Sequence, residues 1–252
     1  VRRINIFMSN TIILIPSRMS AERLPGKPLL EVNGLPIICH VVKKAQETQI
    51  GEVVVATEDE EILNTVKKNH GEAILTSKNP QTGTDRIWEA FQKLNLKNID
   101  HIINLQGDEP LIDINDIKNL DKLTKKNNCE INTLASKIDN KKNLNDQNIV
   151  KVQTENDLEK NRFSVAQKFL RQIDNQLPNI YHHIGIYEFS VSTLETFTNL
   201  EQSNNEKRYK LEQLRAMDNN IKINVSYANT RVIGIDTQED FIELKKIMEY
   251  KS

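Results

Sequence analysis

Cysteine and long apolar runs are both scarce in this chain. Only Cys39 and Cys129 occur among 252 residues, and both lie in or beside apolar segments, so we expect small buried hydrophobes rather than a disulfide or metal site. No apolar run reaches the roughly 20 residues that a membrane-spanning helix requires. The basic first residues are not followed by the apolar stretch of a secretory signal. These absences favour a soluble, reduced, cytoplasmic protein.

Neither sign of charge dominates the chain. There are 34 basic and 35 acidic side chains, which gives a net charge of -1. A surface of this kind does not favour binding of nucleic acid or of an anionic membrane through bulk charge. Hydrophobic residues make up 38% of the sequence, which is enough for a core, and the length allows one large α/β domain or two small ones.

Short apolar strands alternate with helical patterns in the first half. Residues 12–15 are a continuous apolar run that ends at Pro16, which is typical of a strand buried on both faces. Further strands are predicted at 52–57, 72–75 and 101–105, and helices at 36–48, at 58–69 and from about residue 84. This order predicts a mainly parallel sheet with helices on both faces, in which the loops after the strands gather at one edge.

Beyond residue 130 the pattern changes. Strands are predicted at 131–138, 150–153, 181–189 and 221–225, a helix around Leu211, Leu214 and Met217, and a terminal helix with Phe241, Leu244 and Met248. We interpret residues 9–252 as a single domain and residues 1–8 as an N-terminal extension. Within it, about 11–130 would bind a ligand, about 131–230 would form a smaller lobe facing the substrate, and about 231–252 would form a C-terminal turn and helix.

Three cations follow the first strand directly. The loop from Pro16 to Pro28, here called the cation loop, carries Arg18, Arg23 and Lys27. It lacks the glycine patterns of phosphate-binding and dinucleotide-binding loops, so side chains rather than backbone would have to meet phosphates. Arginine forks and a lysine point charge suit that task. Because prolines at both ends and in the middle restrict the loop, we favour an anion site over a solvated basic loop.

Two carboxylates follow other predicted strands. Gly107 permits a tight turn after the strand at 101–105, and Asp108 comes next. A carboxylate there suits Mg²⁺, which takes one or two protein carboxylates together with phosphate oxygens and water. Near the C-terminus, Thr237 and Asp240 match a capping box, so Asp236 is free to share a metal with Asp108. The alternative for Asp236 is a surface residue beside a helix start.

Three further motifs are weak when taken alone. Residues 81–86 form a turn that runs into a helix, which by itself is only an N-cap signature. His182 and His183 lie in a strand that sends one imidazole to each face, and a packed histidine is the more common outcome. Residues 212–215 are predicted on an amphipathic helix, where charges usually form a solvated face.

The motifs taken together resemble the 3-deoxy-manno-octulosonate (Kdo) cytidylyltransferases, also called CMP-Kdo synthetases. The resemblance covers nearly the whole chain in the expected order. The matching segments are RLPGKPL (23–29), GTDR (83–86), QGDEP (106–110), VKV (150–152), HIGIY (183–187), LEQLR (211–215) and GIDTQED (234–240).

The resemblance implies an α/β, Rossmann-like nucleotide-diphospho-sugar transferase fold that usually dimerises. It implies transfer of CMP from CTP to the anomeric hydroxyl of Kdo, with release of pyrophosphate, for lipopolysaccharide or capsule synthesis, with Mg²⁺ as cofactor. The implied catalytic residues are Arg18, Lys27 and Asp108, and the implied metal ligands are Asp108 and Asp236. The implied nucleotide-binding residues are Pro16, Ser17, Arg18, Arg23, Lys27, Gly83, Thr84, Arg86 and Gln106. The implied sugar-binding residues are Gln106, His183, Tyr187, Glu212 and Gln213.

One departure from the family pattern leaves alternatives open. The family typically has Phe-Ser-Arg followed by Ile-Pro, whereas this chain has Phe163, Ser164 and Val165 without Ile-Pro. A lost charge-assisted contact costs about 1.5–3 kcal/mol, which can change the choice of sugar unless Arg162 or Lys168 compensates. The alternatives are a cytidylyltransferase for amino-substituted Kdo or a nine-carbon ulosonate, and a non-catalytic nucleotide-binding homologue.

Overall fold

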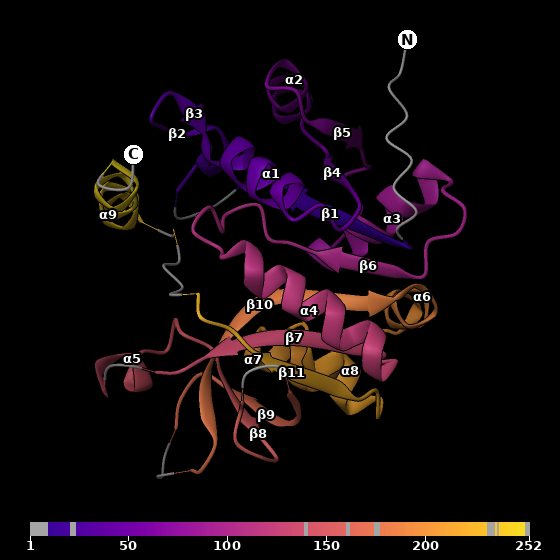
Figure 1. Ribbon diagram of the computed structural model, residues 1–252, viewed down its shortest axis with the longest axis vertical. Helices are drawn as coiled ribbons and strands as arrows, with labels where there is room; N and C mark the ends of the chain where they lie inside the picture. The colour runs from indigo at the N-terminus through magenta and orange to yellow at the C-terminus, as the bar shows by residue number, and fades with distance from the viewer. Residues whose placement is uncertain are drawn as a thin grey trace. The chain divides into compact units, whose positions relative to one another are not determined.

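The chain folds into two compact units. The structure, a computed structural model, describes residues 10–20, 24–138, 141–159, 162–173, 177–230, 235 and 237–249 (Figure 1). One unit comprises Val1–Pro110 with Ile233–Ser252, and the other comprises Leu111–Val232. The change in the sequence pattern lies near residue 131. The two units nevertheless divide at residue 110, because helix α4 (Ile114–Asn127) packs on strands of the second unit.

The first unit contains a parallel sheet with the strand order β5-β4-β1-β6. The strands are β1 (Thr11–Ser17), β4 (Glu52–Thr57), β5 (Glu72–Leu75) and β6 (His101–Asn104). Helices α1 (Ile37–Glu47), α2 (Glu60–Lys68) and α3 (Gly83–Leu94) pack against this sheet. The parallel βαβ prediction is therefore confirmed, and β4 and β5 begin and end at the predicted residues.

Strand β1 extends further than the sequence predicted. Pro16 lies inside the strand, paired with Ala56 of β4. The carbonyl of Leu14 accepts a hydrogen bond from the N–H of Leu105, on the side of β6. The backbone groups of successive residues in a strand point in turn to the two neighbouring strands, so the backbone nitrogen of Pro16 also points to the side of β6. Because β6 has ended there, no partner requires the N–H that proline lacks.

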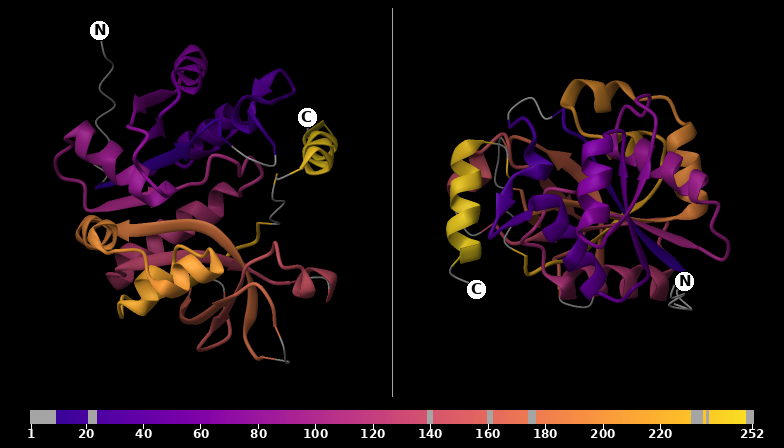
Figure 2. Two further views of the ribbon diagram at one scale, coloured as in Figure 1. Left: turned by 180° about the vertical axis from the view of Figure 1, so that it is seen from behind. Right: turned by 90° about the horizontal axis from the view of Figure 1, so that it is seen from above.

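The remaining elements of the first unit lie near the start and the end of the chain. They are the 3-10 helix η1 (Lys27–Leu29), the hairpin of β2 (Glu31–Val32) and β3 (Leu35–Pro36), and the terminal helix α9 (Gln238–Glu249). Figures 1 and 2 show α9 close to this hairpin, where the side-chain amide of Asn33 donates to the carbonyl of Met248 at 3.5 Å. Segments more than 200 residues apart in the sequence thus lie side by side.

The second unit contains five strands in the order β10-β7-β11-β9-β8. The first and last strands of this order, β10 and β8, also pair with each other. The strands are β7 (Ile131–Ser136), β8 (Lys151–Thr154), β9 (Phe163–Leu170), β10 (Ile180–Ser190) and β11 (Ile223–Tyr227). Besides α4, its helices are α5 (Lys141–Asn145), α6 (Val191–Asn199), α7 (Asn204–Tyr209) and α8 (Leu214–Asp218). The sequence did not predict β9, α4, α5, α6 or α7.

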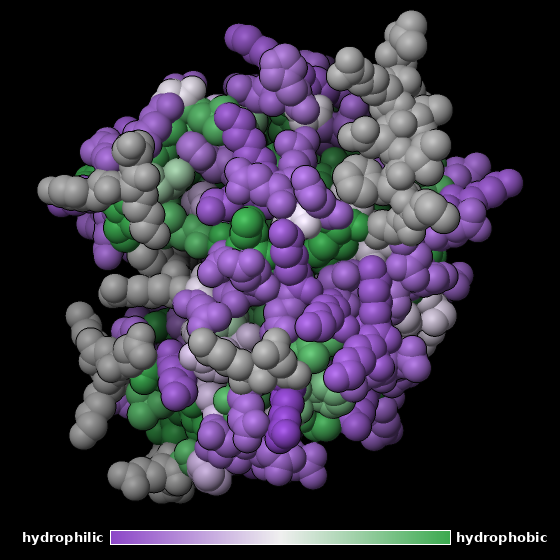
Figure 3. Space-filling model, viewed as in Figure 1, coloured by the Kyte–Doolittle hydropathy of each residue, from purple (hydrophilic) through white to green (hydrophobic). Residues whose placement is uncertain are grey.

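The face of the molecule drawn in Figure 3 is largely hydrophilic, with hydrophobic areas between the polar side chains. Among the residues that the structure describes, the exposed large hydrophobic side chains are Leu75, Tyr209 and Ile242, which lie on three different elements. Within the described ranges, no helix is both long and apolar enough to cross a membrane.

Candidate active site

A cleft of about 730 Å³ opens in the first unit, where β1 and β6 end. Ligand sites of parallel α/β sheets form at the carboxyl ends of the strands, and this volume is within the usual range for a small-molecule site. The cleft is lined by Pro16, Ser17, Arg18, Ser20, Leu24, Lys27, Pro28, Pro80, Thr82, Gly83, Arg86, Gln106, Gly107 and Asp108. Most of the residues predicted to bind nucleotide therefore lie around one cavity.

Lys27 and Asp108 form an ion pair in this cleft. The Nζ atom of Lys27 lies 2.6 Å from the Oδ2 atom of Asp108, and the two side chains are 12% and 39% exposed. A pair so close to solvent contributes little to stability. Its importance is that the structure brings together a cation predicted to hold phosphate and a carboxylate predicted to hold metal, from positions 81 residues apart.

Gly107 lies where the turn before Asp108 passes very close to β1. A Cβ atom at this position would lie 3.1 Å from the carbonyl oxygen of Pro16 and 3.1 Å from the Cδ1 atom of Ile38. The sequence predicted a tight turn at Gly107, and the structure shows that a side chain at this position would crowd β1 and Ile38.

The described part of the cation loop is fixed at Met19. The N–H of Met19 donates to the Oδ2 atom of Asp59 at 2.8 Å, and its carbonyl accepts from the N–H of Gly26 at 3.4 Å. Gly26 has a φ of 72°, in the left-handed region that favours glycine. Arg18, just before this anchor, is exposed and lines the cleft. Arg23 lies outside the described residues, so its role stays a prediction.

The turn at the start of α3 has the predicted N-cap. The Thr82 hydroxyl accepts from the Asp85 N–H, and the Asp85 carboxylate accepts from the Thr82 N–H, each at 3.1 Å. Gly83 stands against Pro16, whose Cγ atom would lie 3.2 Å from an added Cβ. This part of the cleft wall therefore leaves little room for a larger side chain.

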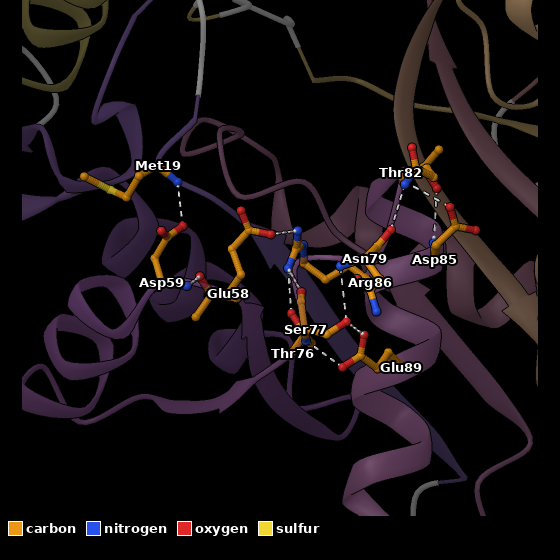
Figure 4. Close-up of polar contacts among 12 residues, drawn as sticks. Met19, Glu58, Asp59, Thr76, Ser77, Asn79, Thr82, Asp85, Arg86 and Glu89 are labelled. Carbon is orange, nitrogen blue, oxygen red and sulfur yellow. Dashed lines mark hydrogen bonds and ion pairs between the residues drawn. The ribbon is translucent and has the colours of Figure 1, made fainter.

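Arg86 lines the cleft, but other protein groups hold its guanidinium. Nη1 donates to the Thr76 hydroxyl at 2.6 Å and to the Ser77 carbonyl at 3.3 Å, and Nη2 lies 2.5 Å from the Glu58 carboxylate (Figure 4). The Glu89 carboxylate in turn accepts from Ser77. Arg86 thus ties the start of α3 to the segments after β4 and β5.

Thr84 and Gln106 are also predicted to bind nucleotide, but only Gln106 lines the cleft. Thr84 is 2% exposed and does not line the cleft, and its hydroxyl accepts from the side-chain amide of Asn104 at 3.1 Å. Gln106 lines the cleft and donates to the Asn104 side chain at 3.3 Å. Thr84 therefore supports the cleft from behind, whereas Gln106 can reach a ligand.

In the second unit, the predicted sugar residues His183 and Tyr187 are neighbours on β10. Their ring centroids are 5.5 Å apart, and the ring of Phe169 meets His183 edge to face at 5.0 Å. Burial, and then the neighbouring His182, lower the pKa of His183 to about 3. Burial, and then the negative charge of Glu212, raise the pKa of Tyr187. At neutral pH the imidazole is therefore uncharged and the phenol keeps its proton.

The helix predicted around residue 211 is shorter than expected. Lys210 takes a left-handed conformation with a φ of 52° and ends α7, and α8 begins only at Leu214. Glu212 and Gln213 therefore lie in the turn between these helices. The helix prediction for both residues was wrong, because the apolar spacing alone did not reveal the break.

Arg215 is buried, whereas the sequence predicted that the charges at 212–215 form a solvated helix face. Its side chain is 2% exposed, and its Nε and Nη2 atoms donate to the two carboxylate oxygens of Glu206 at 2.9 and 2.7 Å. The guanidinium also lies 4.6 Å above the ring of Phe197. This buried pair fixes the turn that carries Glu212 and Gln213.

Val165, the departure from the family pattern, lies on β9 and pairs with Asn224 of β11, whereas its neighbour Ser164 pairs with Val225. Val225 and Tyr187 both pair with Thr133 of β7, so the side chains of Ser164, Val225 and Tyr187 lie on the same face of the sheet. Because neighbouring residues of a strand face opposite sides, position 165 lies on the face opposite Tyr187. An arginine side chain at position 165 would therefore leave the sheet on the face opposite the predicted sugar-binding residue Tyr187.

The predicted metal site is described only in part. Asp108 lies in the cleft, whereas Asp236 lies outside the described residues, so their pairing stays a prediction. Across the described part of the chain, no group of three or more His, Cys, Asp and Glu side chains could hold a metal ion. A single accessible carboxylate beside a predicted phosphate site still fits Mg²⁺, which takes most of its ligands from phosphate and water.

Sequence reasoning missed Glu58 and Asp59. Both lie at the start of the helix predicted at 58–69, and the sequence assigned them no part in the site. In the structure Glu58 binds Arg86, which lines the cleft, and Asp59 binds the N–H of Met19, which lies between the cleft residues Arg18 and Ser20. No spacing in the sequence links these positions to partners 28 and 40 residues away.

The fold and the cleft define an α/β nucleotidyltransferase. A solved UDP-glucose pyrophosphorylase shares the fold, with a TM-score of 0.70 and 14% identity over 96% of this chain and 98% of that one. The cytidylyltransferase family model matches residues 12–223.

More similar proteins narrow the class. The 3-deoxy-manno-octulosonate cytidylyltransferases of Thermodesulfovibrio yellowstonii and Bartonella bacilliformis are 41% and 36% identical, over 94% of this chain and 98% of each relative. The solved structure of CMP:2-keto-3-deoxy-manno-octonic acid synthetase complexed with CTP has a TM-score of 0.87 and 32% identity, over 97% of this chain and 100% of that one. The chain belongs to the cytidylyltransferase family, among the 3-deoxy-manno-octulosonate cytidylyltransferases, so the resemblance noted in the sequence is confirmed.

Proposed function

We propose that this protein transfers CMP from CTP to the anomeric hydroxyl of Kdo and releases pyrophosphate. The observation that carries the proposal is the cleft of the first unit. There, Arg18, Lys27 and Asp108 line one cavity where β1 and β6 end, and Lys27 is paired with Asp108, in a chain that belongs to this family. Cations opposite a carboxylate suit a reaction in which charge moves onto a departing pyrophosphate.

The cations of the cleft have the main role in this proposal. Arg18 and Lys27 would neutralise the triphosphate and the pyrophosphate as it leaves. Lys27 is bound to Asp108 at 2.6 Å, and the triphosphate offers its ammonium group a second set of acceptors. Asp108 and Asp236 would hold Mg²⁺. When bound, this ion supplies Lewis-acid stabilisation of phosphate charge.

Kdo would be bound by Gln106, His183, Tyr187, Glu212 and Gln213. His183 remains neutral at physiological pH because burial lowers its pKa to about 3. It therefore contributes a hydrogen bond rather than a positive charge to the sugar acid. The phenol of Tyr187 is protonated at physiological pH, and burial raises its pKa further, so its hydroxyl is a hydrogen-bond donor. The charge of the sugar carboxylate must then be balanced by another group.

Activation of another acid sugar is the second candidate. Val165 is the observation that favours it, but this residue lies on the sheet face opposite Tyr187. The curated relatives act on Kdo by name. A non-catalytic homologue is disfavoured because Arg18, Lys27 and Asp108 are all retained.

The test is pyrophosphate release from CTP and Mg²⁺ with Kdo, beside amino-substituted Kdo and a nine-carbon ulosonate. Strong release with Kdo alone is the expected result. Preference for another sugar would move the assignment to that sugar. No release with any of the three, in a protein that still binds CTP, would support the non-catalytic alternative.

We also propose a cytoplasmic homodimer that supplies CMP-Kdo for lipopolysaccharide or capsule synthesis. These features rest on the family resemblance. Light scattering coupled to size-exclusion chromatography measures the mass in solution, and a mass of about 29 kDa rather than twice that value would contradict the dimer.

A further inference from the structure

Asp59 begins helix α2 but does not cap it. It occupies the N-cap position, yet its carboxylate makes no hydrogen bond with the N–H groups of its own helix. An aspartate at this position ordinarily satisfies those N–H groups. Instead, its Oδ2 atom accepts from the N–H of Met19, 40 residues earlier in the chain, at 2.8 Å (Figure 4). The carboxylate thus serves the cation loop rather than its own helix.

The position of Asp59 is itself fixed. Its N–H donates to the hydroxyl of Thr57, the last residue of β4, at 3.1 Å, and its carbonyl accepts from the N–H of Leu63 at 3.1 Å. The carboxylate therefore extends from a short, hydrogen-bonded junction between a buried strand and a helix. Such a junction can hold a loop in one place.

Met19 passes this constraint to both cations of the described loop. Its N–H belongs to the peptide bond that follows Arg18, so the bond to Asp59 fixes the backbone at the exposed arginine. Its carbonyl accepts from the N–H of Gly26, the residue before Lys27. One carboxylate thus fixes the backbone next to Arg18 directly and next to Lys27 through a single further hydrogen bond.

We propose that Asp59 is a positioning residue for CTP, which holds the cation loop so that Arg18 and Lys27 meet the triphosphate. Asp59 does not line the cleft, so it acts through Met19 and not by touching the nucleotide. Preorganised cations bind an anion more tightly because less loop and side-chain freedom is lost on binding. The proposal rests on the proposed function only in the choice of CTP as the ligand.

The test compares Asp59→Ala, Asp59→Asn and Glu61→Gln with the unmodified protein. Alanine removes the acceptor for the Met19 N–H, whereas asparagine keeps a neutral acceptor oxygen. Glu61 is exposed in the first turn of the same helix, so Glu61→Gln controls for loss of a charge there. Calorimetric titration gives the Kd of CTP, steady-state kinetics give KM for each substrate, and thermal unfolding checks the fold.

We expect Asp59→Ala to raise the Kd and KM of CTP about tenfold, because the loop and the side chains of Arg18 and Lys27 would then lose their freedom only on binding. Asp59→Asn should restore part of this loss, and Glu61→Gln should bind CTP as the unmodified protein does. The KM of Kdo should stay within about twofold in all variants. An unchanged Kd for CTP in folded Asp59→Ala, or an equal rise in both KM values, would overturn the proposal. If the unmodified protein releases no pyrophosphate, the proposed function fails, but the CTP titration still tests Asp59.

Discussion

Replacing Glu188 by glutamine is expected to remove a pH dependence from the stability of the protein. Glu188 lies in β10 and is fully buried. Burial, and then the negative charge of Asp121 on α4, raise the pKa of this carboxyl group from 4.5 to about 8, although the Thr124 hydroxyl and the Lys125 ammonium group oppose the rise. At neutral pH the folded protein therefore holds Glu188 in its uncharged form.

The sign of the effect follows from the two pKa values. In the unfolded chain Glu188 ionises near pH 4.5, so between pH 4.5 and 8 only the folded state keeps the proton. The stability linked to this group is fully present below the lower value and is lost as the pH rises through the higher one. At 1.4 kcal/mol per pH unit, the loss amounts to about 5 kcal/mol, of which about 4 kcal/mol falls between pH 5 and pH 9.

Urea unfolding of the unmodified protein and of Glu188→Gln at pH 5, 7 and 9 measures this loss. Glutamine has the shape of the neutral carboxylic acid and does not titrate, and the other ionisable groups are common to both proteins. The variant should gain about 4 kcal/mol over the unmodified protein between pH 5 and pH 9. Glu195→Gln, on the exposed face of α6, reports the effect of a charge change alone. A stability difference between Glu188→Gln and the unmodified protein that does not change with pH would refute the reasoning.

Three further substitutions test the cleft. Glu58→Ala leaves the buried guanidinium of Arg86 without its carboxylate and should cost about 3–5 kcal/mol in urea unfolding; a loss below about 1 kcal/mol would contradict the pairing. Asp108→Asn should keep the fold, because its ion pair is partly exposed, but should lower turnover about a hundredfold or more, and near-normal turnover would exclude Asp108 from the reaction. Gly107→Ala places a Cβ atom 3.1 Å from a backbone carbonyl of β1 and should lower stability by about 1–3 kcal/mol, so unchanged thermal unfolding would show that the turn can move.

Local patterns were sufficient for most of the first unit. The apolar run within 52–57 became β4 at the predicted residues because a parallel strand buried on both faces carries its signal in nearly every residue. The run at 72–75 became β5 as predicted, although this strand lies at the edge of the sheet and is partly exposed. The same reasoning did not find β9, in which two adjacent residues near its end are exposed and the simple alternation is lost. It also extended the helix around residue 211 across a turn, because apolar spacing does not record a left-handed residue such as Lys210.

The sequence by itself determined the family, through the motifs that match it, and the chemical types of the cleft residues, since Arg18, Lys27 and Asp108 stand in the loops that follow predicted strands. Only the tertiary structure decided how these residues are held. Lys27 meets Asp108 across 81 residues, and Met19 meets Asp59 across 40. The physical reason is that a parallel sheet brings the ends of distant strands together, whereas the choice of one hydrogen-bond partner among several nearby acids depends on distances of a few ångströms. A linear sequence of side chains carries no such distances.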